Sequence, residues 1–81
     1  MNNSEIIDKL TSVFHTVFDD SNIVLSESTN ADDIDDWDSL SHIMLIAAVE
    51  DAFNCKFSMK DLQNMKFVGD MIARIGELID T

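Results

Sequence analysis

Residues 38–53 read DSLSHIMLIAAVEDAF, and this stretch decides the fold. Asp38 is a good helix N-cap residue, and the apolar positions behind it recur at helical spacing. The apolar face is broad, which predicts that this helix is the central one. The stripe consists of Leu40, Ile43, Ala47 and Phe53, widened by Met44, Ile46 and Val49.

Two amphipathic helices are predicted on either side of the central one. Residues 4–18 place apolar side chains at helical spacing, with Ser4 as the expected N-cap. Residues 68–79 follow the same period, so each helix is expected to lay one face on the core. The inward side chains of the second are expected to be Val68, Met71, Ile72, Ile75, Leu78 and Ile79.

A short helix and a long loop complete the predicted fold. Ser58 followed by Asp61 resembles a capping box and predicts a helix over 58–64. Residues 19–37 form a long polar connection whose few apolar residues should hold it over the core. Those residues are Ile23, Val24, Leu25, Ile34 and Trp37. No segment shows the alternation of a strand, so we predict an all-α four-helix bundle in one domain, residues 1–81.

Composition and charge exclude several classes of protein. The 81 residues include 16 acidic and 5 basic side chains, and the net charge of −11 makes nucleic acid a poor partner. A single cysteine excludes a disulfide framework and a cysteine-based zinc site. No apolar run is long enough to cross a membrane and no secretory signal is visible, which together predict a reduced, cytoplasmic setting.

The negative charge is concentrated in the first two thirds of the chain. Residues 1–55 hold twelve acidic residues and one base, Lys9, whereas residues 56–81 are neutral overall. The densest part, residues 19–38, has eight acidic residues and no base. This pattern fits a solvated acidic loop, a surface that steers basic partners, or both.

The acidic run invites a calcium interpretation, which its spacing does not support. An EF-hand loop needs a glycine at its sharp turn, and no register of residues 32–38 supplies one. The two histidines, His15 and His42, lack metal-ligand spacing. We predict no dedicated metal site, although diffuse screening by divalent ions should stabilise so acidic a fold.

Residues 36–40, Asp-Trp-Asp-Ser-Leu, form the most informative segment for function. They place Ser39 in the first turn of the central helix, where unpaired backbone N–H groups and the helix dipole favour an anion. A phosphate ester on Ser39 Oγ would be stabilised there. The alternative is that Ser39 only fills a cap or first-turn position.

At this segment the sequence resembles the acyl carrier protein family. The family's attachment motif Asp-Ser-Leu stands at residues 38–40, and the apolar helix that follows closes with Glu-Asp-Ala-Phe at residues 50–53. Residues 67–72, FVGDMI, resemble the family's Thr-Val-Gly-Asp-Leu-Val at the start of the last helix. Length, acidity and helix layout agree as well, so the resemblance covers nearly the whole chain.

The resemblance implies a function. Ser39 would accept 4′-phosphopantetheine from coenzyme A through a separate phosphopantetheinyl transferase, with Asp38 and Leu40 completing the attachment site. Acyl groups would then be carried as thioesters on the thiol of the arm. The carrier itself, expected to be a monomer, would catalyse nothing, since no base that could activate Ser39 is visible.

Departures from the family pattern point to a specialised pathway. Asp36 stands where glycine is common, and the apolar, adaptable Met44 stands where carriers of fatty-acid synthesis commonly show glutamate. The chain therefore looks more like a stand-alone carrier of a lipid, polyketide-like or polysaccharide pathway. Its partners would be acyl-loading and acyl-transfer enzymes with basic patches. The expected partner contacts are Asp36, Ile43, Met44, Ala48, Glu50 and Asp51.

Three other functions fit these residues less well. A peptidyl or aminoacyl carrier usually shows Gly-Gly-x-Ser, and residues 36–39 lack the glycines. An unmodified acidic interaction module would have no use for Ser39. A hydrolase built on Ser39, His42 and Asp38 is rejected, because no oxyanion donors or pocket accompany these residues.

The sequence also predicts the surroundings of four other side chains. Trp37 should pack its ring over the junction between loop and helix, and Cys55 should behave as a buried small side chain. His42 is expected beside the prosthetic arm or in solvent. His15 is expected to be solvated.

Overall fold

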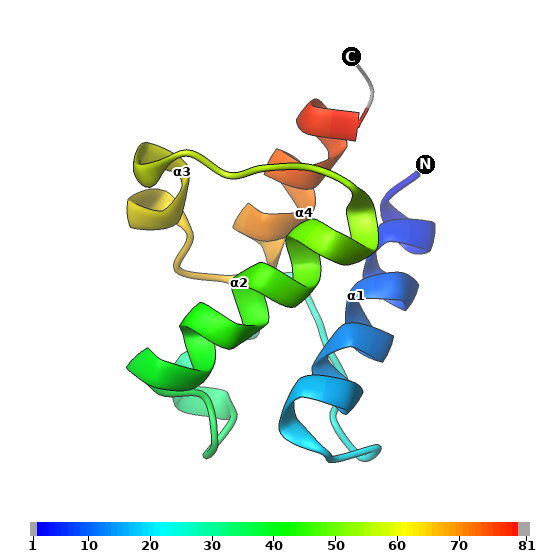
Figure 1. The fold of residues 1–81 in the computed structure, drawn as a ribbon. Helices are drawn as coiled ribbons and strands as arrows, with labels where there is room; N and C mark the ends of the chain where they lie inside the picture. Colours follow the sequence, from blue (N-terminus) through cyan, green and yellow to red (C-terminus); the bar gives the residue numbers. More distant parts are fainter. Residues whose placement is uncertain (1, 80–81) are drawn as a thin grey trace.

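The computed structural model describes residues 2–79. Its helices are α1 (Asn3–Phe18), a short 3-10 helix (Ala31–Asp33), α2 (Ser39–Phe53), α3 (Met59–Asn64) and α4 (Val68–Ile79), arranged as Figure 1 shows. Within the described residues strand-like pairing is limited to one isolated bridge, between Asn30 and Phe67. The predicted all-α four-helix fold is confirmed. The domain limits at 1–81 stay a prediction.

Helix α1 starts two residues earlier than its predicted N-cap would allow. The cap is Asn2, whose side chain accepts the Glu5 N–H at 2.9 Å, while the Glu5 carboxylate accepts the Asn2 N–H at 3.4 Å. A cap at Ser4 would place Ile7 at the third helical position, where no reciprocal bond is possible. The prediction of Ser4 was therefore wrong, because the complete capping box favours Asn2.

The core lies where α1 packs against both α2 and α4. Its centre is fully buried, and each such side chain contributes roughly 1.5–3 kcal/mol by leaving water. Its most deeply buried members are Ile6, Leu10, Phe14, Leu45, Val49, Val68, Met71 and Ile75. On α4 the predicted inward face is confirmed, with Leu78 and Ile79 half-buried.

Helix α2 buries only part of the predicted stripe, namely Ile46, Val49 and Phe53. Leu45, Ile46, Val49 and Phe53 are buried, whereas Leu40, Ile43, Met44 and Ala47 are exposed. Apolar residues occur on all sides of α2, so their spacing alone could not select the buried face. The consequence is an exposed apolar surface beside Ser39.

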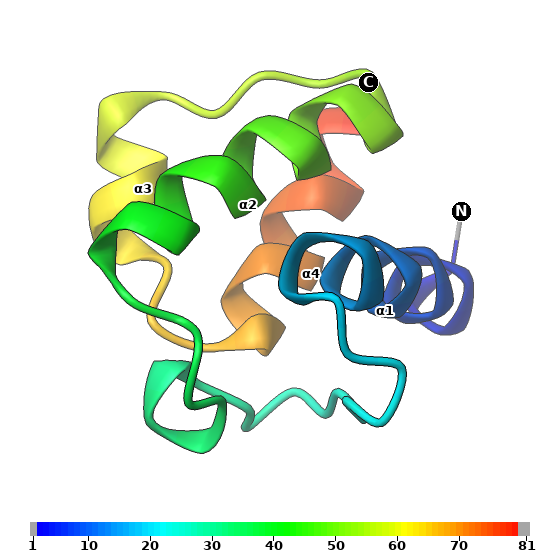
Figure 2. The same cartoon turned by 60° about the horizontal axis from the view of Figure 1, so that its bottom comes forward.

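The long connection from α1 to α2 runs along one side of the bundle (Figure 2). Leu25 is buried and Ile23 is half-buried, but Val24 is 85% exposed, which corrects the expectation that it packs on the core. The loop also caps α4, because the carbonyl of Thr29 accepts the Val68 N–H at 2.8 Å. These contacts fix the loop against the bundle and so fix where α2 can begin.

Candidate phosphopantetheine attachment site

The start of α2 is capped by Asp38 and Ser41. Asp38 Oδ1 accepts the Ser41 N–H at 2.9 Å, and Ser41 Oγ accepts the Asp38 N–H at 2.8 Å. The bond from the Ser41 backbone is the main reason that the pKa of the Asp38 carboxyl lies below its usual value. The predicted N-cap Asp38 is confirmed, and the acid is held in its charged form at the helix start.

Ser39 takes no part in this cap. The Ser41 hydroxyl donates to the carbonyl of Asp36 at 2.7 Å, so Ser41 also ties the helix to the acidic loop. Ser39 is exposed at the first helical position, and within residues 2–79 its Oγ has no hydrogen-bond partner. The capping role that was an alternative for Ser39 is thus filled by its neighbours, and its hydroxyl is free for chemistry.

Trp37 anchors the junction between the loop and α2. Its side chain is 8% exposed, and its ring meets Phe14 edge-on with centroids 5.2 Å apart. Its Nε1–H donates to Nδ1 of His42 at 3.0 Å, with the two rings stacked 5.9 Å apart. The expected packing of Trp37 is confirmed. His42 is half-buried rather than in solvent, and burial lowers its pKa.

The contacts of His42 and Asp38 also bear on the hydrolase interpretation. Nδ1 of His42 accepts the Trp37 N–H, and Oδ1 of Asp38 accepts the Ser41 N–H. A catalytic relay would need the Asp38 carboxylate on the imidazole that faces Ser39. The structure engages both groups elsewhere, so it offers no Ser-His-Asp geometry.

The surface next to Ser39 is apolar. Leu40, Ile43 and Met44 share one exposed face of α2, with 71%, 67% and 57% of their surfaces exposed. Solvated apolar side chains gathered on one face are typical of a protein-interaction surface. Sequence spacing had assigned all three to the core stripe as well as to the site.

The acidic and small candidates for partner contact differ in their surroundings. Asp36 and Asp51 are exposed, and Ala48 is half-buried. Glu50 is half-buried, and its Oε2 accepts the Phe57 N–H at 2.8 Å. Glu50 therefore shapes the turn between α2 and α3, a role with no sequence signal because the bond spans seven residues.

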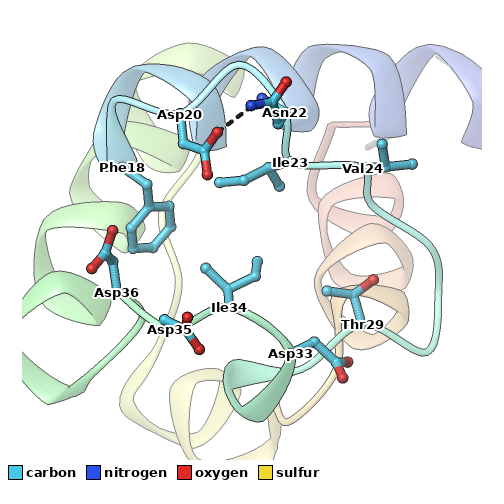
Figure 3. Close-up of a pocket in the computed structure, with 10 residues that line it drawn as sticks. All are labelled: Phe18, Asp20, Asn22, Ile23, Val24, Thr29, Asp33, Ile34, Asp35 and Asp36. Atoms are coloured by element: carbon cyan, nitrogen blue, oxygen red, sulfur yellow. Dashed lines mark hydrogen bonds between the residues drawn. The ribbon is translucent and has the colours of Figure 1, made fainter.

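A cavity of about 590 Å³ lies under the acidic loop (Figure 3). Phe18, Ile23 and Ile34 point into it, while Asp20 is tied at its rim to the Asn22 N–H at 2.9 Å. Its lining is completed by Val24, Thr29, Asp33, Asp35 and Asp36. So many carboxylates make the cavity unsuited to a fatty chain.

An apolar groove runs between α1 and α2. It has a volume of about 340 Å³, and its lining includes Val13, Val17, Ala48 and Ala52. The small alanines of α2 leave this hollow beside the larger valines of α1. Lys9, Ser12, Thr16 and Asp51 complete its lining, but the surface inside it is mainly apolar, in contrast to the cavity under the loop.

Cys55 and His15 lie away from Ser39. Cys55 is half-buried against the core, and burial raises its pKa, with the charge of Glu50 adding to the effect. Cys55 was expected to be buried, and the structure shows it only partly so, packed against the edge of the core. His15 was wrongly expected in solvent: it is half-buried, and its Nε2–H donates to the carbonyl of Ile23 at 2.8 Å.

Metal and membrane features were also predicted from the sequence. Across residues 2–79, no three His, Cys, Asp or Glu side chains are placed to hold a metal ion together. In the same part of the chain, no helix has the length and apolar character needed to span a membrane.

The fold has a close counterpart among solved structures. The chain is 44% identical to the holo acyl carrier protein of Geobacter metallireducens, determined by solution NMR, with a TM-score of 0.87. The match covers 91% of this chain and 85% of that one. This chain belongs to the acyl carrier protein family. No protein-family model and no curated protein matches it.

The prosthetic group of acyl carrier proteins is 4′-phosphopantetheine. The likeness to a holo acyl carrier protein therefore confirms the predicted cofactor. The start of α2 fits the group, because the Ser39 hydroxyl is exposed and free. The end of α2 nearest Ser39 is also the positive end of the helix dipole, which suits a phosphodiester.

Proposed function

We propose that this acyl carrier protein carries acyl groups as thioesters on a 4′-phosphopantetheine arm attached to Ser39. The observation that supports this most is the free, exposed hydroxyl of Ser39, beside a cap built entirely from Asp38 and Ser41. When bound, the group supplies a thiol at the end of a long arm. The chain supplies the attachment point and the surface that enzymes recognise.

The attachment step needs a second enzyme. Ser39 Oγ bonds to the phosphorus of coenzyme A that carries the pantetheine group, and the bond from that phosphorus to 3′,5′-ADP breaks. The hydroxyl proton passes to a base on the phosphopantetheinyl transferase. The nearby His42 is engaged with Trp37, and Asp38 with Ser41, so neither is available as that base. We therefore assign no catalytic step to the carrier.

Asp38 and Leu40 flank Ser39 and have separate roles in this proposal. Asp38 holds the first turn of α2 in place, as its bonds to Ser41 indicate. Leu40 is exposed and supplies apolar contact to the enzyme that modifies Ser39.

The partner surface combines apolar contact with acidic steering. Ile43 and Met44 project from α2 next to Ser39. Asp36 is exposed in the loop just before α2, and Asp51 is exposed near the other end of the helix. Acyl-loading and acyl-transfer enzymes with basic rims around an apolar patch would fit this surface. Ala48 lies within it, half-buried, whereas Glu50 acts mainly through the turn that it holds.

The exposed Met44 supports a specialised lipid, polyketide-like or polysaccharide pathway over housekeeping fatty acid biosynthesis. A flexible thioether adapts to apolar partners, whereas a glutamate at this place would suit a basic one. The monomeric state and the cytoplasmic location stay predictions. The following experiment distinguishes a carrier from an unmodified interaction module. A peptidyl carrier would gain the same arm and would differ only in the group that it carries.

The proposal predicts covalent modification of one serine. Incubation with coenzyme A and a broad-specificity transferase should raise the intact mass by one phosphopantetheine, and Ser39→Ala should abolish the gain. Ser41→Ala is the matched control: it removes a neighbouring hydroxyl that the structure commits to the cap, and it should still be modified. A folded native chain that gains no mass would contradict the proposal and favour the interaction module.

A further inference from the structure

Trp37 and His42 bracket Ser39, one residue in the loop and the other on α2. We propose that they are positioning residues for the modification of Ser39, which act by joining the first turn of α2 to the core. We propose further that protonation of His42 undoes this link. This inference rests on the proposed function, since it concerns how Ser39 is presented to the transferase.

The loop side of the link is rigid. Trp37 is buried, and its ring contacts two aromatic side chains of α1, Phe14 at 5.2 Å and Phe18 at 6.4 Å between centroids. Aromatic contacts of this kind are directional. The position of the Trp37 ring is therefore set by α1 and not by the acidic loop alone.

The helix side of the link is one hydrogen bond with a defined direction. An indole N–H can only donate, so Nδ1 of His42 accepts it and carries no proton. The imidazole proton is then on Nε2. In a protonated imidazole both nitrogens are donors, and the bond to Trp37 cannot form. A buried indole N–H without an acceptor is unfavourable, so the ring pair would have to separate.

Burial, and not the charge of neighbouring groups, determines the direction of the pH effect. Phe14 and Phe18 face it from α1 and are uncharged, Asp36 adjoins Trp37 in the loop, and Asp38 precedes His42 by one turn with its carboxylate held by Ser41. Burial lowers the pKa of His42 from its ordinary value of 6.5, and no neighbouring charge contributes to that change. As pH falls below 6.5, the unfolded or opened chain binds the proton first, so the link weakens.

Ser39 lies between the two ends of this link. When the bond to His42 is made, the first turn of α2 is held to α1 through Trp37 as well as by its own cap. When the bond is lost, the Asp38–Ser41 cap still keeps the turn helical. The expected consequence is a misplaced Ser39 rather than an unfolded chain, and a small misplacement can lower a reaction rate by up to about 10²-fold.

The chain offers a direct readout of the link. Trp37 is its single tryptophan, so ¹⁵N NMR shows one indole N–H signal. Between pH 7.5 and 5 we expect this signal and the Ser39 amide signal to move together, with a midpoint below 6.5. In His42→Asn, whose side-chain oxygen replaces Nδ1 as acceptor without titrating, neither signal should move. His15→Gln, a matched control on the other histidine, should leave the native titration unchanged.

Loading of Ser39 tests the functional half of the inference. The transferase has its own pH dependence, so the rate of the native chain is divided by the rate of His42→Asn at each pH. This ratio should be close to one at pH 7.5 and fall several-fold by pH 5.5. His42→Leu, which removes the acceptor, should be loaded on the order of tenfold more slowly at every pH. His42→Asn, which keeps an acceptor, should restore the loading rate.

Each outcome of these experiments has a distinct meaning. A ratio that stays constant with pH, or an indole signal that does not titrate in the native chain, would overturn the positioning role. Absence of loading in the native chain at all pH values would instead refute the modification of Ser39, and the NMR titration would still show whether the link exists. If His42→Leu does not fold, the pH dependence of the native chain against His42→Asn still decides the question.

Discussion

Three neighbouring residues, Asp38, Ser39 and Ser41, have distinct duties at the start of α2. Asp38 and Ser41 satisfy each other's backbone N–H groups, and the Ser41 hydroxyl also reaches the carbonyl of Asp36. Helix starts need such partners because their first N–H groups have none within the helix. With that need met by its neighbours, the Ser39 hydroxyl can face solvent without loss of stability.

Asp38 gives a residue-scale prediction about acid stability. Its folded pKa lies below the ordinary 3.8, mainly because of the bond from the Ser41 backbone, so the unfolded chain binds its proton first. Its contribution is therefore complete above the ordinary pKa and is lost as pH falls through the lower, folded value. Asp38→Asn keeps a cap acceptor but cannot titrate. The stability difference between native and variant chains, measured by denaturant unfolding, should be constant above about pH 5 and shrink toward pH 2.

Asp61 also has a lowered pKa, so both chains should unfold in acid and only their difference isolates Asp38. Parallel stability curves from pH 6 to pH 2 would show that the Asp38 charge contributes nothing to the cap.

At the scale of elements, α4 shows how a loop and a helix constrain one another. Gly69, in its first turn, donates its N–H to the carbonyl of Glu27 at 2.9 Å. A Cβ on Gly69 would lie 2.9 Å from that same carbonyl oxygen, whereas one on Gly76 would meet only Ile6 Cδ1, at 3.8 Å. Both glycines have ordinary negative φ angles. The close approach of the loop thus requires a glycine at position 69. Nothing in the surroundings of Gly76 requires a glycine there.

The two glycines should respond oppositely to the same substitution. Gly76→Ala should stabilise the fold by about 0.5–1 kcal/mol, because alanine restricts the unfolded chain and favours the helix. Gly69→Ala should destabilise it by about 1–3 kcal/mol, because the loop backbone must move away from α4. Thermal or denaturant unfolding of the two variants measures this. Equal effects of the same sign would mean that helix propensity, and not the loop contact, governs both sites.

At the scale of the whole molecule, the charge of −11 acts over a body of only 33 × 25 × 22 Å. The screening length is about 30 Å at 0.01 M salt and about 10 Å at 0.1 M. In dilute buffer a basic partner is therefore attracted by the charges of the whole chain. In moderate salt it is attracted mainly by the charged groups near the contact. Apolar contacts through Met44 do not depend on salt in this way.

Salt should separate steering from contact during loading by the transferase. The kcat/KM of the native chain should fall by about tenfold as NaCl is raised from dilute buffer, and Asp36→Lys should flatten this dependence. Met44→Ser should lower kcat/KM to a similar extent at every salt concentration. Asp8→Lys makes the same charge change on α1 and is the matched control, with a slope close to native. If Asp8→Lys and Asp36→Lys have equal slopes, only net charge matters and Asp36 is not part of the docking surface.

Much of this protein could be predicted from the sequence because the features concerned are local. Capping boxes involve residues three apart, so Asp38 and Ser58 were placed correctly as caps, and the amphipathic pattern of residues 68–79 identified the buried face of α4. The Asp-Ser-Leu motif, together with the apolar helix that follows it and the match at residues 67–72, likewise indicated the family, which the solved acyl carrier protein then confirmed.

Other features were decided only by tertiary structure. Helix α2 is apolar all round, so its buried face depends on where α1 and α4 lie, and Leu40 and Ile43 became surface residues. Three hydrogen bonds join residues whose separation in the sequence follows no helical or capping pattern. They link Trp37 to His42, Phe57 to Glu50 and His15 to Ile23. Helical spacing specifies which residues share a face. Which face is covered, and which distant groups meet, depends on how the whole chain packs.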